Sequence, residues 1–147
     1  MLIFLMSLAI AKQYSFMGHW NETPNIIVCE RSGVLVEDVT KAAEYWREKG
    51  YKLGSIEKRS SCTTKYPNGF IQFNDPKNDV DTVRSFGHSQ LQQHASTITS
   101  VSIQISPEGA QYYEVIAHEL GHALGIHHVD DINDIMYINH VYEFTRF

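Results

Sequence analysis

A chain of 147 residues has the usual size of a single domain and can bury a hydrophobic core without help. Apolar residues make up 43% and charged residues 20%, and no apolar run is long enough to span a bilayer, so we expect no stable membrane insertion. The net charge of −5, without any run of Lys and Arg, argues against nucleic acid as a partner. We expect a monomer.

The apolar segment at residues 2–11 allows two interpretations. Its last residues, Ala9-Ile10-Ala11, have the small-x-small form of a signal-peptidase site, but no basic residue precedes the run and the segment is short for a signal peptide. We therefore divide the chain into a signal or N-terminal segment, residues 1–17, and a folded domain, residues 18–147. An extracellular or secreted protein is expected; an intracellular one, or a part of a larger particle, is the alternative.

The two cysteines allow only one pairing, Cys29 with Cys62. An exported protein would join them in a disulfide, whereas an intracellular protein would keep two buried thiols. Neither belongs to a Cys-x-x-Cys pair, so a role in metal binding is not favoured.

The first half of the chain predicts a strand, a helix and a second strand. Residues 26–29 form a short apolar run, and apolar residues then recur at helical spacing from Leu35 to Trp46, with Gly50 as a C-terminal stop. Residues 52–58 fit an extended segment. A strand–helix–strand unit of this kind favours neighbouring parallel strands.

Three further runs predict strands: Phe70–Phe73, Val80–Phe86 and the clearly alternating Ile98–Ile105. Ser106 as N-cap and Pro107 at the first helical position then predict the start of a long helix. On that helix His118 and His122 point nearly opposite to the apolar face, so one side can pack on a sheet while the other offers histidines to a cleft. The apolar face consists of Tyr113, Ile116, Ala117, Leu120 and Leu124.

The most informative stretch is HELGHALGIHH, residues 118–128, which has the spacing H-E-x-x-H-x-x-G-x-x-H. His118 and His122 lie on one helix face and can share a zinc ion. Gly125 lets the chain leave the helix in a left-handed conformation and turn back. The spacing then favours His128, rather than the adjacent His127, as the third ligand. Three protein ligands and one open position are typical of a catalytic zinc, whereas structural sites have four.

The chain resembles the metzincin metallopeptidases from about Ser106 to Tyr137. Asp134-Ile135-Met136-Tyr137 begins six residues beyond His128 and is similar to that family's tight turn with a buried methionine beneath the metal. Tyr137 directly follows Met136, as in matrixins, whereas Val129 is not diagnostic of a subfamily, so the subfamily is unassigned. The resemblance implies an α+β fold: a twisted, mostly parallel sheet with an antiparallel edge strand, packed on two main helices. Which of the three runs named above is the edge strand is left open.

The resemblance implies a zinc endopeptidase with one catalytic Zn²⁺ and a peptide or protein substrate. Glu119 would act as the general base that activates a zinc-bound water, and would then pass the proton to the leaving amine. Met136 would form the floor of the site, with Gly125 and Met136 as its structural support. The wall of the substrate pocket would include Tyr137, Ile138, Asn139 and His140.

Two other functions stay open. The motif indicates attack on a carbonyl group but does not determine which kind of substrate contains it. A zinc hydrolase of a non-protein amide, such as a peptidoglycan cross-link, is therefore one alternative. The other is a catalytically silent zinc-binding structural module, against which the intact Glu119 argues.

Three weaker constellations accompany the motif. The polar loop with Asp75, Asn78, Asp79 and Asp81 lacks the order of a calcium motif, so an acidic turn is favoured over calcium. His88 and His94 are interpreted as surface histidines rather than a second zinc site. Asp130, Asp131 and Asp134 could shape the loop after His128, and one could accept a ligand imidazole N–H.

Overall fold

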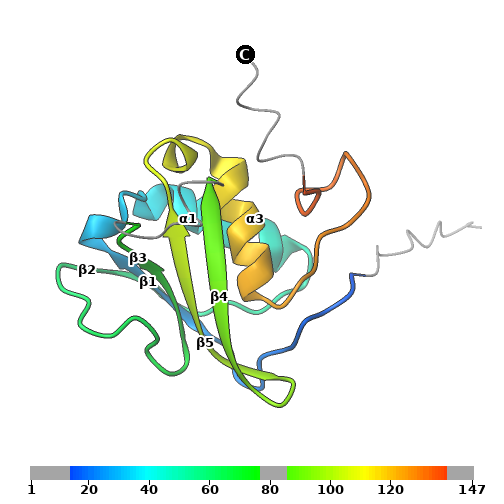
Figure 1. The fold of residues 1–147 in the computed structure, drawn as a ribbon, viewed down its shortest axis with the longest axis horizontal. Coiled ribbons are helices and arrows are strands. Elements are labelled where there is room, and N and C mark those ends of the chain that lie inside the picture. The colour runs from blue at the N-terminus through cyan, green and yellow to red at the C-terminus, as the bar shows by residue number, and fades with distance from the viewer. Residues whose placement is uncertain (1–13, 77–85, 139–147) are drawn as a thin grey trace, which may run out of the picture.

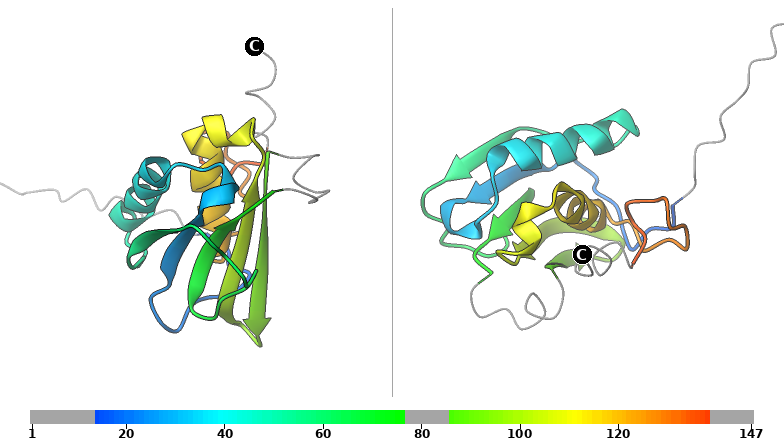
Figure 2. Two further views of the ribbon diagram at one scale, coloured as in Figure 1. Left: turned by 90° about the vertical axis from the view of Figure 1, so that its left-hand side faces the viewer. Right: turned by 90° about the horizontal axis from the view of Figure 1, so that it is seen from above.

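A twisted five-stranded sheet carries two α-helices on one of its faces (Figures 1 and 2). The structure is a computed structural model that describes residues 14–76 and 86–138. The strands are β1 Asn25–Cys29, β2 Ile56–Arg59, β3 Phe70–Asn74, β4 Gly87–His94 and β5 Thr97–Ile105. The helices are α1 Val36–Glu48 and α3 Tyr113–Ala123, with short 3-10 turns at Glu30–Ser32 and Gly109–Gln111.

The strand order is β2-β1-β3-β5-β4, with every neighbouring pair parallel except β4 and β5. Alternate residues of β3 and β5, among them Phe73 and Ile103, are fully buried on the face that the helices cover. This arrangement confirms the predicted α+β fold, with a mostly parallel sheet, an antiparallel edge strand and two main helices.

The edge strand is β4, which the sequence did not predict as a strand. The Phe70–Phe73 run lies within β3 and the Ile98–Ile105 run within β5, and both strands are interior. The Val80–Phe86 run lies outside the described residues except for Phe86. The sequence of β4, GHSQLQQH, has one large apolar residue, Leu91, because most of this strand is only partly covered. Residues with high strand propensity are those that pack well on a half-buried sheet surface, so a polar edge strand is difficult to recognise from its sequence.

Helix α1 ends where the sequence predicts. Gly50 has a φ of 97°, and its N–H donates to the Arg47 carbonyl at 2.9 Å. Such a left-handed glycine closes a helix because it has no Cβ to clash. Trp46 is fully buried, and its indole N–H donates to the Ala117 carbonyl at 2.8 Å. This bond joins α1 to α3 and fixes the helix that carries the histidine motif.

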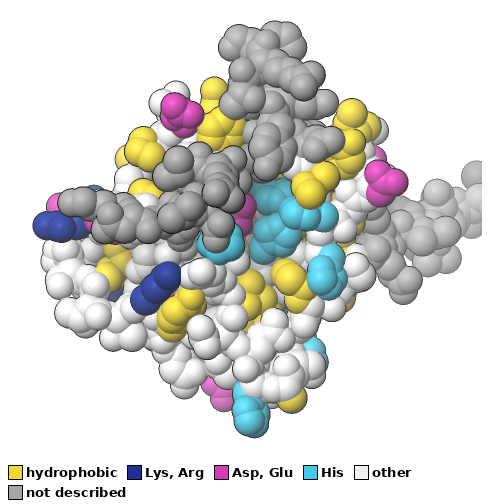
Figure 3. Space-filling model, viewed as in Figure 1, with side chains coloured by type: hydrophobic (Ala, Val, Ile, Leu, Met, Phe, Trp, Pro, Cys, Tyr) yellow, Lys and Arg dark blue, Asp and Glu magenta, His cyan; other side chains and the backbone are white. Residues whose placement is uncertain are grey.

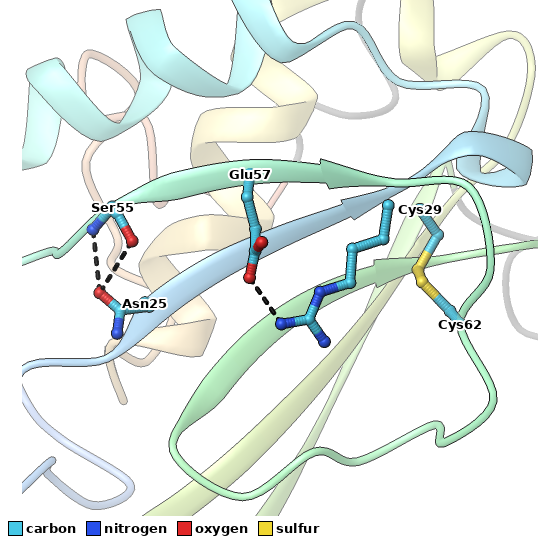
Figure 4. Close-up of polar contacts among 6 residues, drawn as sticks. Asn25, Cys29, Ser55, Glu57 and Cys62 are labelled. Atoms are coloured by element: carbon cyan, nitrogen blue, oxygen red, sulfur yellow. Dashed lines mark hydrogen bonds and ion pairs between the residues drawn. A yellow bond between two sulfur atoms is a disulfide. The ribbon is translucent and has the colours of Figure 1, made fainter.

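Strand β2 is shorter than the segment predicted at residues 52–58, because it begins at Ile56. The Asn25 side-chain oxygen accepts hydrogen bonds from the Ser55 N–H at 2.9 Å and the Ser55 hydroxyl at 3.3 Å (Figure 4). The Ser55 N–H therefore bonds to the Asn25 side chain, and the register of β2 with β1 begins at the next residue, Ile56.

A disulfide joins Cys29, the last residue of β1, to Cys62 in the segment that leads to β3 (Figure 4). The two residues are 33 positions apart. The bond therefore closes a long loop across two neighbouring strands.

We expect Cys62→Ser to lower the free energy of unfolding by about 3–4 kcal/mol, because it releases a loop of this length in the unfolded chain. Urea denaturation of the parent and the variant, each with and without reductant, measures the effect. Reductant should bring the parent close to the variant and leave the variant unchanged. A parent whose unfolding midpoint does not move on reduction would contradict the prediction.

Candidate metal centre

Helix α3 begins at Tyr113, not at the predicted Ser106. The Ser106 hydroxyl does accept a hydrogen bond from the Gly109 N–H at 3.0 Å, but Gly109 begins a short 3-10 turn that ends at Gln111, before α3. Tyr112 then adopts an extended conformation that separates the turn from the helix. A Cβ on Gly109 would lie 2.4 Å from the Phe86 carbonyl oxygen, so close packing on the chain before β4 shapes this turn.

The predicted apolar face of α3 is buried: Ile116, Ala117 and Leu120 have no exposed surface. The opposite side is also covered, since His118 is 2% exposed and Glu119 is 5% exposed. The site reaches solvent at the end of the helix. Figure 3 shows histidine side chains gathered in one patch over α3, beside β4.

Three ring nitrogens converge at this patch. His118 Nε2 and His122 Nε2 lie 3.1 and 3.0 Å from His128 Nε2, and the ligand atoms of the three residues all fall within 4.8 Å of one another. Four nitrogens placed tetrahedrally at the usual zinc distance are about 3.3 Å apart. The two distances to His128 are therefore close to the separation expected of nitrogens that share one zinc ion.

Backbone carbonyls orient two of the three rings. His118 Nδ1 lies 2.7 Å from the Ile135 oxygen and His122 Nδ1 lies 2.8 Å from the Ile126 oxygen, so each Nδ1 carries the proton and donates. Each Nε2 then presents a lone pair towards His128. The Nδ1 protons thus leave the Nε2 atoms of His118 and His122 free to bind a metal ion. In His118 and His122 the acceptor of the imidazole N–H is therefore a carbonyl and not one of the nearby aspartates.

Burial keeps these rings neutral. Desolvation lowers the pKa of His122 to about 4 and also lowers the pKa of His128. A histidine must be neutral to bind a metal, so both residues are in the ligand form at neutral pH.

The turn at Gly125 brings His128 into the cluster. Gly125 has a φ of 93°, and a Cβ there would lie 2.1 Å from the Gly18 carbonyl oxygen. No other residue type fits without displacing the backbone of Gly18. The reversed chain leaves the side chain of His127 outside the three-histidine group, while its backbone N–H donates to the Ser15 carbonyl at 3.0 Å.

Met136 packs beneath α3 and is fully buried. A Cβ on Gly121 would lie 2.4 Å from the Met136 sulfur, so the helix glycine and the methionine fit closely. The Met136 N–H donates to Asp134 Oδ1 at 2.8 Å, and its carbonyl accepts from the Val129 N–H at 3.1 Å. The tight turn is thus held by a buried aspartate, and it contacts α3 at Gly121 and His118.

Tyr14, which carried no signal in the sequence, is tied to the same turn. Its hydroxyl donates to Asp134 Oδ2 at 2.9 Å, and burial followed by this contact raises the pKa of Tyr14. The Met17 N–H donates to the Gly125 carbonyl at 2.6 Å. The chain from Tyr14 to Met17 therefore packs on the domain ahead of the boundary expected at residue 18.

Glu119 is held against the edge strand. The Ser89 hydroxyl lies 2.5 Å from Glu119 Oε2, and a Cβ on Gly87 would lie 2.8 Å from Glu119 Cγ. Neither β4 residue was singled out in the sequence. With β4 unrecognised, no local pattern could place these residues beside the motif.

The other predicted residues are less fully described. Tyr137 is half-buried and Ile138 is 49% exposed where the chain leaves the turn. Asn139 and His140 of the predicted pocket lie outside the described residues, as do Asn78, Asp79 and Asp81 of the acidic loop; Asp75 lies inside them. His88 and His94 lie on β4, and within the described residues neither belongs to a group of three potential metal ligands.

The sheet, its antiparallel edge and the three-histidine group define a metallopeptidase domain of the metzincin type. A family model described as matrixin matches residues 37–146, which is more than half of the chain, so the chain belongs to the matrixin family. No curated protein and no solved structure matched the chain. The family makes the protein a zinc metalloendopeptidase in general, with peptide or protein substrates. None of the described helices is long and apolar enough to cross a membrane.

Proposed function

We propose that this protein hydrolyses internal peptide bonds, with His118, His122 and His128 as the zinc ligands and Glu119 as the general base. One observation carries the proposal: three imidazole nitrogens converge at a helix that also carries a buried carboxylate. Helix α3 holds His118, His122 and Glu119, and the turn at Gly125 brings in His128 as the third ligand.

The donor set fits zinc. Three neutral imidazoles are ligands that zinc prefers, and three protein ligands leave a position for water or substrate. When bound, zinc polarises a substrate carbonyl and makes a water acidic enough to ionise near neutral pH. Calcium is not favoured here, because the cluster offers nitrogen rather than oxygen ligands.

Glu119 would transfer the proton from the water to the leaving amine. Its carboxylate takes a proton from the attacking water and returns it to the amine that leaves when the peptide bond breaks. Its burial supports this role, because a carboxylate shielded from bulk water keeps a fixed position relative to the histidines. Gly125 and Met136 would serve as structural support, the first by shaping the turn and the second by packing beneath the helix.

The substrate would lie along β4. Among the described residues this strand pairs with β5 and is the last of the sheet, so its other side would accept an extended peptide by main-chain hydrogen bonding. Tyr137, Ile138, Asn139 and His140 would line the adjoining pocket. The exposed Ile138 offers an apolar surface at that place.

The disulfide supports an extracellular location, because such bonds persist in oxidising compartments. The protein would then act on peptides or proteins outside the cell, as a monomer.

Metal removal and return test the proposal. We expect the zinc-loaded protein to cleave internally quenched peptides, to lose this activity after chelation, and to regain it with one equivalent of zinc. Cross-linked peptidoglycan is assayed in parallel. Cleavage of peptidoglycan alone would replace the proposal with a non-protein hydrolase. No cleavage of either substrate, with one zinc bound per chain, would indicate a silent binding module.

A further inference from the structure

We propose that Ser89 of the edge strand is a positioning residue, which holds the Glu119 carboxylate in the orientation needed for proton transfer. The inference rests on the proposed function, since it assigns Ser89 a part in the work of Glu119. It also makes a claim about the metal-free protein, which can be tested separately.

The Ser89 hydroxyl faces two acceptors on the same residue. It lies 2.5 Å from Glu119 Oε2 and 3.1 Å from the Glu119 carbonyl oxygen. A hydroxyl has one hydrogen to donate, and hydrogen bonds to a carboxylate are both shorter and stronger than those to a neutral carbonyl. The shorter contact has the length expected of a charge-assisted bond, so the hydrogen goes to Oε2.

Gly87 also packs closely against the Glu119 side chain. Gly87 and Ser89 are two residues apart on one strand, so they lie on the same face, the one that α3 covers. A Cβ on Gly87 would lie 2.8 Å from Glu119 Cγ and 3.2 Å from Glu119 Cδ. Strand β4 therefore packs against the Glu119 side chain at Gly87, which has no side chain of its own, and contacts the carboxylate through the Ser89 hydroxyl.

The strand itself is fixed by its partner. Gly87 pairs with Ile105 and Ser89 pairs with Ile103, and both isoleucines belong to the core. The orientation of Glu119 is thus set by the sheet as well as by α3. A flexible side chain that is already ordered loses less entropy when the reaction begins, which is how a positioning residue raises kcat.

The first test uses the metal-free protein and measures unfolding in urea. We expect Ser89→Ala to raise the unfolding equilibrium constant by about 10- to 100-fold in the parent, the usual value of a hydrogen bond to a charged group. In the Glu119→Ala background the same change should have a much smaller effect, because only the backbone acceptor remains. Equal effects in both backgrounds would overturn the inference.

The second test measures kinetics of the zinc-loaded variants. We expect Ser89→Ala to lower kcat by about tenfold or more with KM little changed, and Ser89→Thr, which keeps the hydroxyl, to restore most of kcat. Ser60→Ala is the matched control, because Ser60 is exposed and follows β2, at the opposite edge of the sheet from β4. Equal losses in the Ala and Thr variants would overturn the inference. Coupling in the metal-free protein together with an inactive parent would support the Ser89 contact and contradict the proposed function.

Discussion

Glu119→Gln should lower kcat/KM for a peptide by about 10²- to 10⁴-fold, while the protein keeps one zinc per chain. Glutamine has nearly the shape of glutamate but cannot take a proton from water at neutral pH. His118 and His122 do not depend on that carboxylate for their orientation, since backbone carbonyls hold both rings. Initial rates over a range of peptide concentrations and metal analysis of the same samples check both halves of the prediction.

Glu44→Gln is the matched control for that experiment. Glu44 is exposed and lies on α1, whereas the ligands and Glu119 lie on or directly after α3. Its replacement should leave the rate within a factor of about two, because surface substitutions away from special features have small effects. A Glu119→Gln protein that keeps most of the parental rate would rule out Glu119 as the base.

His128→Ala should weaken zinc binding by more than about 100-fold. Loss of a residue that only orients a ligand already costs about 10- to 100-fold in metal affinity, and here the ligand itself is removed. His128 is the best of the three to change, because it is exposed and its loss leaves no buried cavity. Competition with a chromophoric chelator measures the affinity.

His127→Ala provides the control for the ligand assignment. Its side chain is exposed, and its contact with Ser15 uses the backbone N–H, which the substitution retains. We expect zinc affinity close to that of the parent. The opposite pattern, with zinc lost from His127→Ala and kept by His128→Ala, would reverse the assignment.

Local spacing explains why much of this site could be predicted from the sequence. Helical periodicity puts His118 and His122 on one face, and a glycine at the helix end implies a reversal of the chain, so few arrangements of the motif are possible. The apolar face of α3 follows from the same period, and its residues are buried except for the partly buried Tyr113. The interior strands β3 and β5 are apolar on the helix-facing side, which makes them visible in a single sequence.

The rest of the site depends on contacts between distant parts of the chain. Ser89 meets Glu119 across 30 residues, and Tyr14 meets Asp134 across 120 residues. Neither pair has a local pattern, because each forms only when the sheet and helices are assembled. The predicted start of α3 at Ser106 was wrong for a related reason. Ser106 and Pro107 are good helix-starting residues, but Gly109 packs closely on Phe86, and the chain forms a separate 3-10 turn before α3 begins.

Helix α3, which carries the candidate site, is contacted from two sides. Ser89 and Gly87 on β4 hold the carboxylate, and Asp134 holds the methionine turn together with Tyr14. The edge strand thereby connects the place where a peptide would bind to the residue that would move the proton. Substitutions on β4 facing α3 should accordingly affect turnover more than substitutions on its other face.

Digestion of an unstructured peptide library in water enriched in heavy oxygen tests the central claim most directly. Zinc-loaded protein is incubated with the library, and the products are identified by mass spectrometry. We expect cuts at internal peptide bonds, with one heavy oxygen in each newly formed carboxyl group, because water supplies the attacking oxygen. Peptides that stay intact while each chain holds one zinc ion would contradict the assignment of this site as an endopeptidase.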